Sequence, residues 1–192
     1  PAHGLRFRFT LCAGGIAFLT FLVTVGTGVL LMFYYRPSTV QAHGDVLALT
    51  QEVPFGALMR AMHRYAGDLM IVAVFVHMIR VLLAGAYRRP RELNWVVGVL
   101  LLVLTLAIAF TGYLLPWSQK GYWATTVAAH MLEAAPGVGP WLQQALLGGS
   151  TVGEAALVRF YVLHCVALPL AGAALMALHF WRVRKDGISE PL

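Results

Sequence analysis

The sequence predicts an all-α membrane protein built as a bundle of four transmembrane helices, and three observations support this fold class. Apolar residues make up 59% of the 192 residues and charged residues only 11%, unlike an ordinary soluble domain. Four apolar runs along the chain are each long enough to span a bilayer, which takes about 20 residues. Two of these runs carry histidine pairs of nearly matched spacing.

The apolar runs set the expected helices at about residues 9–35, 60–86, 94–117 and 157–183. The first and third carry no charge, and residues 65–87 of the second are interrupted only by Asp68 and Arg80. A chain of this length has room for one such bundle and its loops. We therefore expect residues 1–192 to form a single transmembrane domain.

The connections between these runs differ in character. Residues 36–59 form a polar connection between the first two helices. Residues 118–156 are moderately apolar but contain Pro136, Pro140 and a glycine-rich stretch, so they are too broken to span. We expect short interfacial helices at about 122–150.

Basic residues predict the orientation in the membrane. Nine of the fourteen Lys and Arg residues lie near the two termini and in the connection between the second and third helices. By the positive-inside rule, both termini are expected to face the cytoplasmic side of the membrane. The net charge of +6 is explained by this topology and by contact with anionic lipid, and nucleic acid is not needed as a partner.

Histidine spacing gives the geometry of a site. The 14-residue step from His63 to His77 falls about 40° short of four helical turns and rises about 21 Å. The 15-residue step from His164 to His179 overshoots by about 60° and rises about 22 Å. Two helices lying side by side would therefore meet at two levels, His63 with His164 and His77 with His179.

Paired imidazoles at two levels predict two stacked heme b groups. Bis-histidine ligation takes one imidazole from each side of the iron, and a separation of about 20 Å would put one heme near each membrane surface. The alternative is that these histidines bond to backbone groups or to each other. Ionisable side chains inside a membrane are rare and usually functional, and four in register favour metal ligation.

Glycines and arginines repeat the histidine levels on the helices. Gly14 and Gly28 are 14 residues apart on the first helix, and so are Gly98 and Gly112 on the third. Because glycine has no side chain, we expect these positions to give clearance to a heme edge. Arg60 and Arg80 flank His63 and His77, so each is expected to reach a heme propionate or to snorkel to the interface.

Ordered motifs then identify a family. The chain resembles cytochrome b of quinol-oxidising complexes, most closely the four-helix cytochrome b6 type, from about residue 9 to 192. The 15-residue spacing on the fourth helix also matches that type. The resemblance is carried by these segments: C-A-G-G-I at 12–16, T-G at 27–28, F-Y-Y-R-P at 33–37, H-R-Y at 63–65, R-R-P-R-E-L at 88–93, T-G-Y-L-L-P-W-S-Q at 111–119, G-Y-W-A at 121–124, R-F-Y-V-L-H at 159–164, and H-F-W-R-V-R-K-D-G-I-S-E-P-L at 179–192.

The resemblance implies a specific role for the two hemes. His63 and His164 would ligate the low-potential heme on the outer side, and His77 and His179 the high-potential heme on the cytoplasmic side. In the family, quinol gives one electron to an iron–sulfur protein and the other to this heme pair, which carries it to a second quinone site. Proton translocation follows from this charge separation.

Cys12 is implied to hold a third heme. With two cysteines and no C-x-x-C-H, the chain has no ordinary c-type heme site. However, Cys12 aligns with the cytochrome b6 cysteine that forms a single thioether to an extra heme at the cytoplasmic quinone site; the alternative is a small apolar filler. Arg184 would then contact that heme or quinone.

The outer quinol site is represented only in part. Tyr113, Pro116 and Trp117 match the segment that walls this pocket in the family, although an interfacial aromatic anchor with a helix stop is an equally simple explanation. Ser118 and Lys120 depart from the plant pattern. No P-E-W-Y-like segment occurs, so the proton-accepting Glu is expected on a separate small subunit that also supplies the remaining helices.

The resemblance therefore implies an electron-transfer subunit with an incomplete active site of its own. The expected complex is dimeric and is of the quinol:cytochrome c or quinol:plastocyanin type. It includes a Rieske-type iron–sulfur protein and a c-type cytochrome, and lies in a bacterial cytoplasmic or photosynthetic membrane.

Two other function classes stay open on the sequence. A non-redox helical scaffold or transporter would share the hydropathy but would not need the histidine register. A cytochrome b6-like heme and quinone anchor in another respiratory complex, such as a dehydrogenase or reductase, would share every feature, and its partner subunits would distinguish it.

Overall fold

The structure, a computed structural model, describes residues 12–187, and all regular secondary structure in that range is helical. Four helical segments within it are long and apolar enough to cross a membrane. The predicted fold class, an all-α membrane protein with four spanning helices, is confirmed.

Three of the spans are continuous α-helices. Helix α1 runs over Ala13–Met32, α3 over Gly56–Leu83 and α4 over Glu92–Leu114. Their ends lie within a few residues of the predicted ranges 9–35, 60–86 and 94–117. Residues 9–11 of the first prediction, and the basic residues Arg6 and Arg8 used for orientation, lie outside the described part of the chain.

The fourth span, Glu154–Asp186, contains a break in its α-helical register. It consists of α7 at Glu154–Val162, a π-helical segment η1 at Leu163–Ala167, and α8 at Leu168–Asp186. Pro169 explains the position of this break, because a proline inside an α-helix lacks an N–H and crowds the carbonyl one turn earlier. The wider π turn, with the Leu168 N–H bonded to the Leu163 carbonyl, accommodates the ring.

Helices also occupy the connections. The segment 36–59, expected as a polar connection, contains the helix α2 at Ala42–Gln51. The segment expected to hold interfacial helices at about 122–150 contains α5 at Gln119–Glu133 and α6 at Gly139–Leu147. Helix α5 begins with a side-chain cap, in which the Ser118 hydroxyl accepts a hydrogen bond from the Gly121 N–H.

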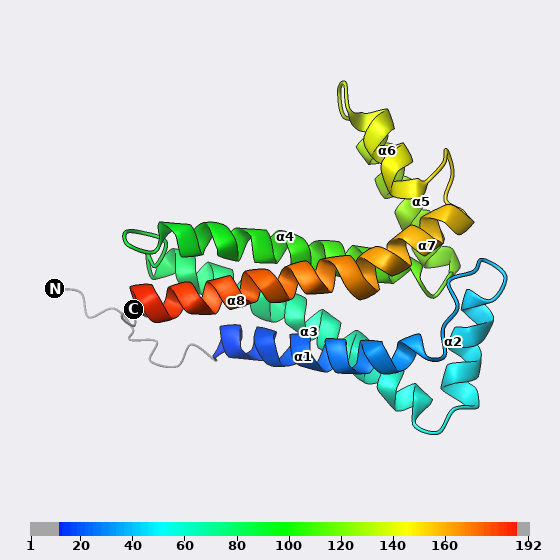
Figure 1. Cartoon of the computed structure of the whole chain (residues 1–192), viewed down its shortest axis with the longest axis horizontal. Helices are drawn as coiled ribbons and strands as arrows, with labels where there is room; N and C mark the ends of the chain where they lie inside the picture. Colours follow the sequence, from blue (N-terminus) through cyan, green and yellow to red (C-terminus); the bar gives the residue numbers. More distant parts are fainter. Residues whose placement is uncertain (1–11, 188–192) are drawn as a thin grey trace.

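The spans pack as two pairs, α1 along α3 and α4 along α8 (Figure 1). The beginning of α1 and the end of α8 lie at the same end of the bundle, which we call the inner end. The opposite, outer end carries α2 and the hairpin of α5 and α6, which projects away from the bundle axis. These names follow the orientation predicted from the basic residues.

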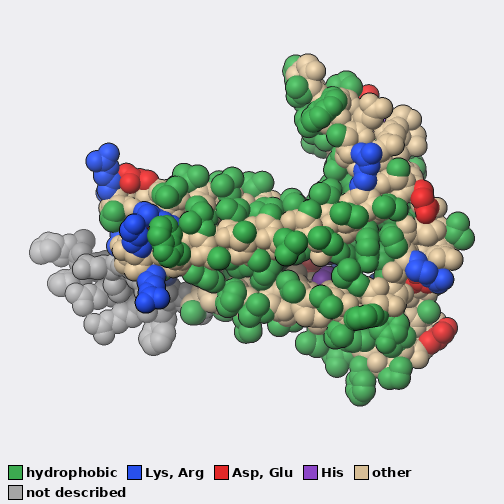
Figure 2. Space-filling view, viewed as in Figure 1, with side chains coloured by type: hydrophobic (Ala, Val, Ile, Leu, Met, Phe, Trp, Pro, Cys, Tyr) green, Lys and Arg blue, Asp and Glu red, His purple; other side chains and the backbone are tan. Residues whose placement is uncertain are grey.

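Apolar burial is concentrated at the outer end. Leu114, Leu157 and Phe160 are fully buried there, in a cluster that joins α4 and α7 to α2, α5 and α6. Along the spans, by contrast, apolar side chains cover the visible face of the bundle and charged side chains gather at its ends (Figure 2). This distribution is expected of a protein whose middle part is surrounded by lipid.

Candidate functional site

Imidazoles from opposite helix pairs meet between α3 and the fourth span. His63 and His77 lie on α3, His164 lies in the π segment and His179 lies on α8. In the space-filling view, a histidine side chain is visible at the bottom of a furrow between the two helix pairs (Figure 2). The structure thus brings together all four histidines singled out in the sequence, in two pairs.

The two pairs have nearly the same geometry. The ring centroids of His63 and His164 are 6.1 Å apart, with an angle of 72° between the ring planes. Those of His77 and His179 are 6.3 Å apart, at 79°. The pairing by level is the one that the 14- and 15-residue steps predicted.

This separation fits a metal held between two imidazoles. With a metal–nitrogen bond of about 2.0 Å on each side, the two ring centres stand about 6 Å apart. Within residues 12–187, no group of three or more His, Cys, Asp or Glu side chains could hold a metal ion in another arrangement. Two axial imidazoles are the ligand set of a low-spin heme, so the residues fit heme iron at both levels.

A glycine on the partner helix faces each imidazole. A Cβ built at Gly14 would lie 3.2 Å from the His77 ring, and one at Gly28 would lie 3.1 Å from the His63 ring. At Gly112 it would lie 2.9 Å from Nδ1 of His164. The sequence interpretation gave these glycines to heme edges; in the structure, the group beside each is the imidazole of a neighbouring helix.

Gly98 is the loosest of the four glycine positions. A Cβ there would be 3.8 Å from the His179 ring, which is an ordinary van der Waals contact. The tightest packing between helix backbone and imidazole is therefore at the outer level, at His164.

The π segment corrects the expected angle of the fourth helix. A regular α-helix would rotate His179 by about 60° past the direction of His164. The π turn accommodates one extra residue without adding a full α-helical step, so the 15-residue spacing becomes equivalent to the 14-residue step on α3. His164 and His179 can then both face the α3 histidines.

Backbone carbonyls hold the two outer imidazoles. Nδ1 of His63 lies 3.0 Å from the Thr24 carbonyl oxygen, and Nδ1 of His164 lies 2.8 Å from that of Ile108. A proton on Nδ1 donates to these oxygens and leaves Nε2 free to bind a metal. The bonds to backbone groups that were the alternative to metal ligation are thus present at the outer level, and they are compatible with it.

The flanking arginines take different positions. Arg60 is half-buried and donates to the Thr50 hydroxyl on α2 at 3.3 Å, whereas Arg80 is half-buried on the last turns of α3. Arg184 is exposed. Its neighbour Arg182 is largely enclosed and pairs with Asp186 at 2.7 Å. The assignments of Arg60, Arg80 and Arg184 to propionates or quinone stay predictions.

Cys12 is exposed and immediately precedes α1 at the inner end. It lies two residues before Gly14, which faces His77, so its level is that of the inner imidazole pair. Cys165 is a free cysteine beside His164 and is partly buried.

The residues predicted to contact quinone lie where α4 ends and α5 begins. Tyr113 is half-exposed, whereas Pro116 and Trp117 are half-buried. Trp117 packs edge-on against Tyr122, with ring centroids 5.9 Å apart. The Pro116 carbonyl oxygen lies 3.2 Å from Nδ1 of His43 on α2, so this turn is tied to two neighbouring helices.

Tyr35 supports the same turn from the end of α1. Its hydroxyl donates to the Leu115 carbonyl at 2.6 Å, and its ring stacks on Tyr161 at 5.6 Å. Burial raises the pKa of Tyr35 above its usual value, with a smaller contribution from Cys165, so the group stays a neutral donor. The aromatic contacts favour a shaped wall at the outer end.

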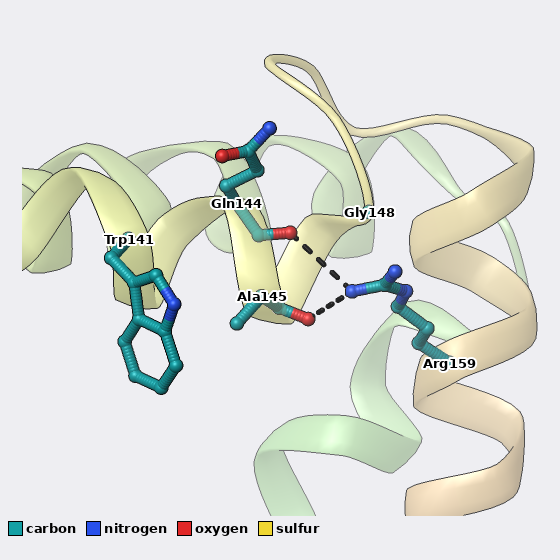
Figure 3. A pocket seen from close by; sticks show the side chains of 5 residues that line it. All are labelled: Trp141, Gln144, Ala145, Gly148 and Arg159. Carbon is teal, nitrogen blue, oxygen red and sulfur yellow. Dashed lines mark hydrogen bonds between the residues drawn. The ribbon is translucent and has the colours of Figure 1, made fainter.

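A separate cavity of about 330 Å³ lies between α6 and α7, away from the histidine furrow (Figure 3). Arg159 donates to the carbonyls of Gln144 and Ala145 at the last turn of α6, as the dashed lines show. Gly148 ends that helix with a positive φ of 74°. Since Arg159 satisfies helix carbonyls, this cavity is explained as a helix-end contact, and none of the predicted site residues lines it.

Comparisons with known proteins agree with this site. The family model for cytochrome b/b6/petB matches residues 5–187. Cytochrome b6 of Heliomicrobium gestii is 47% identical over 192 residues, covering 100% of this chain and 89% of the relative. Cytochrome b6 of Chlamydomonas reinhardtii is 46% identical over 181 residues, covering 94% and 84%.

A solved chain of a hyperthermophilic respiratory Complex III has the same fold. It aligns with a TM-score of 0.86 at 32% identity, covering 94% of this chain and 49% of that one. The present chain thus spans about half the length of that solved chain. From its four spans, its two imidazole pairs and these matches, the chain belongs to the cytochrome b/b6 family and is an integral membrane protein of the heme b type.

Proposed function

We propose that this chain carries electrons across the membrane through two hemes b, between an outer and an inner quinone site. It is the b-type cytochrome subunit of a quinol-oxidising complex of the b6f/bc type. The observation that supports the electron path is the pair of imidazole bridges, with ring centroids 6.1 and 6.3 Å apart. His63 and His164 would bind the outer heme, and His77 and His179 the inner one.

The protein residues supply position and environment, whereas heme iron supplies one-electron chemistry. The 14-residue step on α3 separates the two levels by about 21 Å along the helix axis, most of the thickness of a hydrocarbon core of about 30 Å. Gly14, Gly28 and Gly112 let a helix backbone lie close to an imidazole. Arg60 and Arg80 are placed near the two ends of α3 to offset propionate charge.

We propose Tyr113, Pro116 and Trp117 as part of the outer quinol site. Their turn is held by Tyr35, His43 and Tyr122, which supports a fixed wall there. The general base of this site would come from a further subunit, because none of these three side chains is a carboxylate or an imidazole, the usual proton acceptors.

As a member of this family, the chain works within a membrane complex that contains other subunits. We propose that these are a Rieske-type iron–sulfur protein, a c-type cytochrome and a small helical subunit, in a dimeric assembly. The termini would face the cytoplasm, since basic residues gather at the inner end.

We also propose a third heme joined covalently to Cys12. The thiol would add across a heme vinyl group, so that the sulfur bonds to one carbon and the thiol hydrogen passes to the other. Exposure of Cys12 at the level of the inner imidazole pair supports this assignment. Heme should remain with the wild-type chain on a denaturing gel and be lost in Cys12→Ala; a Cys12→Ala chain that keeps the stain would contradict it.

The proposed path is tested by removing one ligand from the purified complex. His63→Ala should lose one heme b from the visible spectrum and bring quinol oxidation near background, because the first electron acceptor after quinol in this path is gone. His130→Ala, which changes an exposed histidine on α5, is the matched control and should keep both properties. Quinol oxidation at the wild-type rate without the outer heme would refute the proposal.

A further inference from the structure

Two buried threonines contact the outer imidazoles and have no counterparts at the inner level. Oγ1 of Thr27 lies 3.0 Å from Nδ1 of His63, and Oγ1 of Thr111 lies 3.4 Å from Nδ1 of His164. Both threonines are less than 10% exposed. Each outer ring nitrogen therefore has two oxygen neighbours, a backbone carbonyl and a hydroxyl.

The direction of these hydrogen bonds follows from the hydroxyl protons. The Thr27 hydroxyl donates to the Val23 carbonyl at 2.6 Å, and the Thr111 hydroxyl donates to the Ala107 carbonyl at 2.8 Å. Since each hydroxyl has only one proton, its oxygen is left to accept from the ring. An imidazole bound to a metal through Nε2 carries its proton on Nδ1, so it is the donor.

The two levels differ in the residue that precedes each glycine. Thr27 and Thr111 immediately precede Gly28 and Gly112, which face the outer rings. The residues before the inner glycines, Ala13 and Val97, have no polar side-chain atom.

The inner imidazoles accordingly lack these bonds. Within residues 12–187, neither His77 nor His179 has a side-chain hydroxyl within hydrogen-bond distance of its ring, as His63 and His164 do. Nδ1 of His179 is buried, and its polar neighbour is the backbone of Asn94.

We infer that Thr27 and Thr111 are positioning residues that lower the reduction potential of the outer heme relative to the inner one. This inference rests on the proposed di-heme function. An acceptor on Nδ1–H makes the imidazole a stronger electron donor through Nε2 and fixes the ring about its side-chain bonds. Stronger donation favours ferric over ferrous iron, and ligand hydrogen bonding is one of the levers by which proteins set heme potentials.

The contact distances predict a graded effect. Thr27 is the closer acceptor, at 3.0 Å against 3.4 Å for Thr111, so its loss should matter more. Valine has nearly the shape of threonine without the acceptor, and serine keeps the acceptor. Thr105 is a buried threonine whose hydroxyl bonds to the Leu101 carbonyl of its own helix, so Thr105→Val is the matched control.

The test is a redox titration of the purified holo-complex, with each heme followed by its visible spectrum and its ferric electron paramagnetic resonance signal. In Thr27→Val the outer heme should shift to a higher midpoint potential, with a smaller shift in the same direction in Thr111→Val. The inner heme should keep its potential in both. Thr27→Ser and Thr105→Val should match the wild type.

Each result decides the question. An outer potential that stays fixed or falls in both valine variants would overturn the inference, and so would an equal shift of both hemes. If Thr27→Val loses the outer heme, retention in Thr27→Ser supports the hydroxyl as the feature that holds the ring, whereas loss in both variants refutes it. A wild-type complex without two hemes b would instead refute the proposed function.

Discussion

At the scale of single residues, glycine and histidine act as matched halves of one contact. Every imidazole in the site has a glycine of the adjacent helix beside it, but the clearances differ. A Cβ would come within 2.9 Å of a ring nitrogen at Gly112, about 3 Å from a ring at Gly28 and Gly14, and 3.8 Å from the ring at Gly98. The need for glycine should follow the same order.

This order is directly testable with alanine. Gly112→Ala should displace the His164 ring and deplete the outer heme while sparing the inner one, because a Cβ has no room there. Gly98→Ala should keep both hemes. Gly26→Ala is the control, since nothing lies within 4 Å of that position and alanine favours a helix by up to about 1 kcal/mol.

Visible spectra of the purified variants measure the two hemes separately. Equal heme loss in Gly112→Ala and Gly26→Ala would show that general helix packing, and not clearance for an imidazole, sets the requirement.

Sequence reasoning found the residues that have a strong periodic signal and missed those that do not. The four histidines and their four glycines were found because histidine and glycine at a regular spacing are conspicuous in mostly apolar helices. Thr27 and Thr111 were missed, because a threonine in a membrane helix ordinarily bonds to its own backbone and needs no partner. The signal available was the repeated Thr-Gly dipeptide, present at the outer glycines and absent at the inner ones.

At the scale of elements, the π segment is what lets both histidines of the fourth span face α3. The 15-residue spacing was read correctly, but the expected 60° offset was wrong, because it assumed an unbroken α-helix. Pro169 was the local sequence cue for a break, and the extra residue is accommodated at His164, one of the proposed heme ligands. Single π turns inside α-helices are frequent at functional sites.

Helix α2 could not be predicted from its sequence pattern. It has a mixed apolar and polar composition and no side-chain cap, so neither hydropathy nor capping marks it. Its first turn is instead anchored by tertiary contacts: Asp45 is 8% exposed and accepts hydrogen bonds from the Arg36 guanidinium at 2.5 and 3.0 Å and from the Arg36 backbone N–H at 2.9 Å. Contacts of this kind follow from the fold.

The anchor predicts a pH dependence. Hydrogen bonds from Arg36 hold the pKa of the Asp45 carboxyl below its ordinary value of 3.8. A lowered folded-state pKa means that the stabilisation is fully present above pH 3.8 and is lost as pH falls through the folded pKa.

Amide hydrogen exchange of α2, corrected for intrinsic rates, measures this effect. Protection in the wild type should be constant from pH 7 to about pH 4 and fall below that, whereas Asp45→Asn should be less protected at pH 7. Glu52→Gln, at the other end of α2, should behave as the wild type does. Wild-type protection in Asp45→Asn at pH 7 would contradict the claim that the Arg36–Asp45 ion pair anchors α2.

At the scale of the whole molecule, the protein has a tightly packed outer end and two helix pairs whose histidines face each other. The buried cluster of Leu114, Leu157 and Phe160 fixes the outer end. Further along, α1 packs with α3 and α4 with α8, and the imidazole pairs are among the contacts between the two halves, together with Phe18 against Phe180. Heme bound at both levels would cross-link the pairs through metal bonds.

The overall arrangement was only partly predictable. Hydropathy gave the number of spans, whereas the orientation inferred from the basic residues stays a prediction. The outward course of the α5 and α6 hairpin and the burial of the cluster beneath it depend on contacts between distant segments, which periodicity does not reveal.

Heme content per chain tests the central claim most directly. The purified chain should yield two acid-acetone-extractable hemes b, both with low-spin bis-imidazole spectra, and His164→Ala and His77→Ala should each lose one of them. A heme retained after extraction would report on Cys12 separately. One extractable heme or none in the wild type, or the same loss in His130→Ala, would contradict the account.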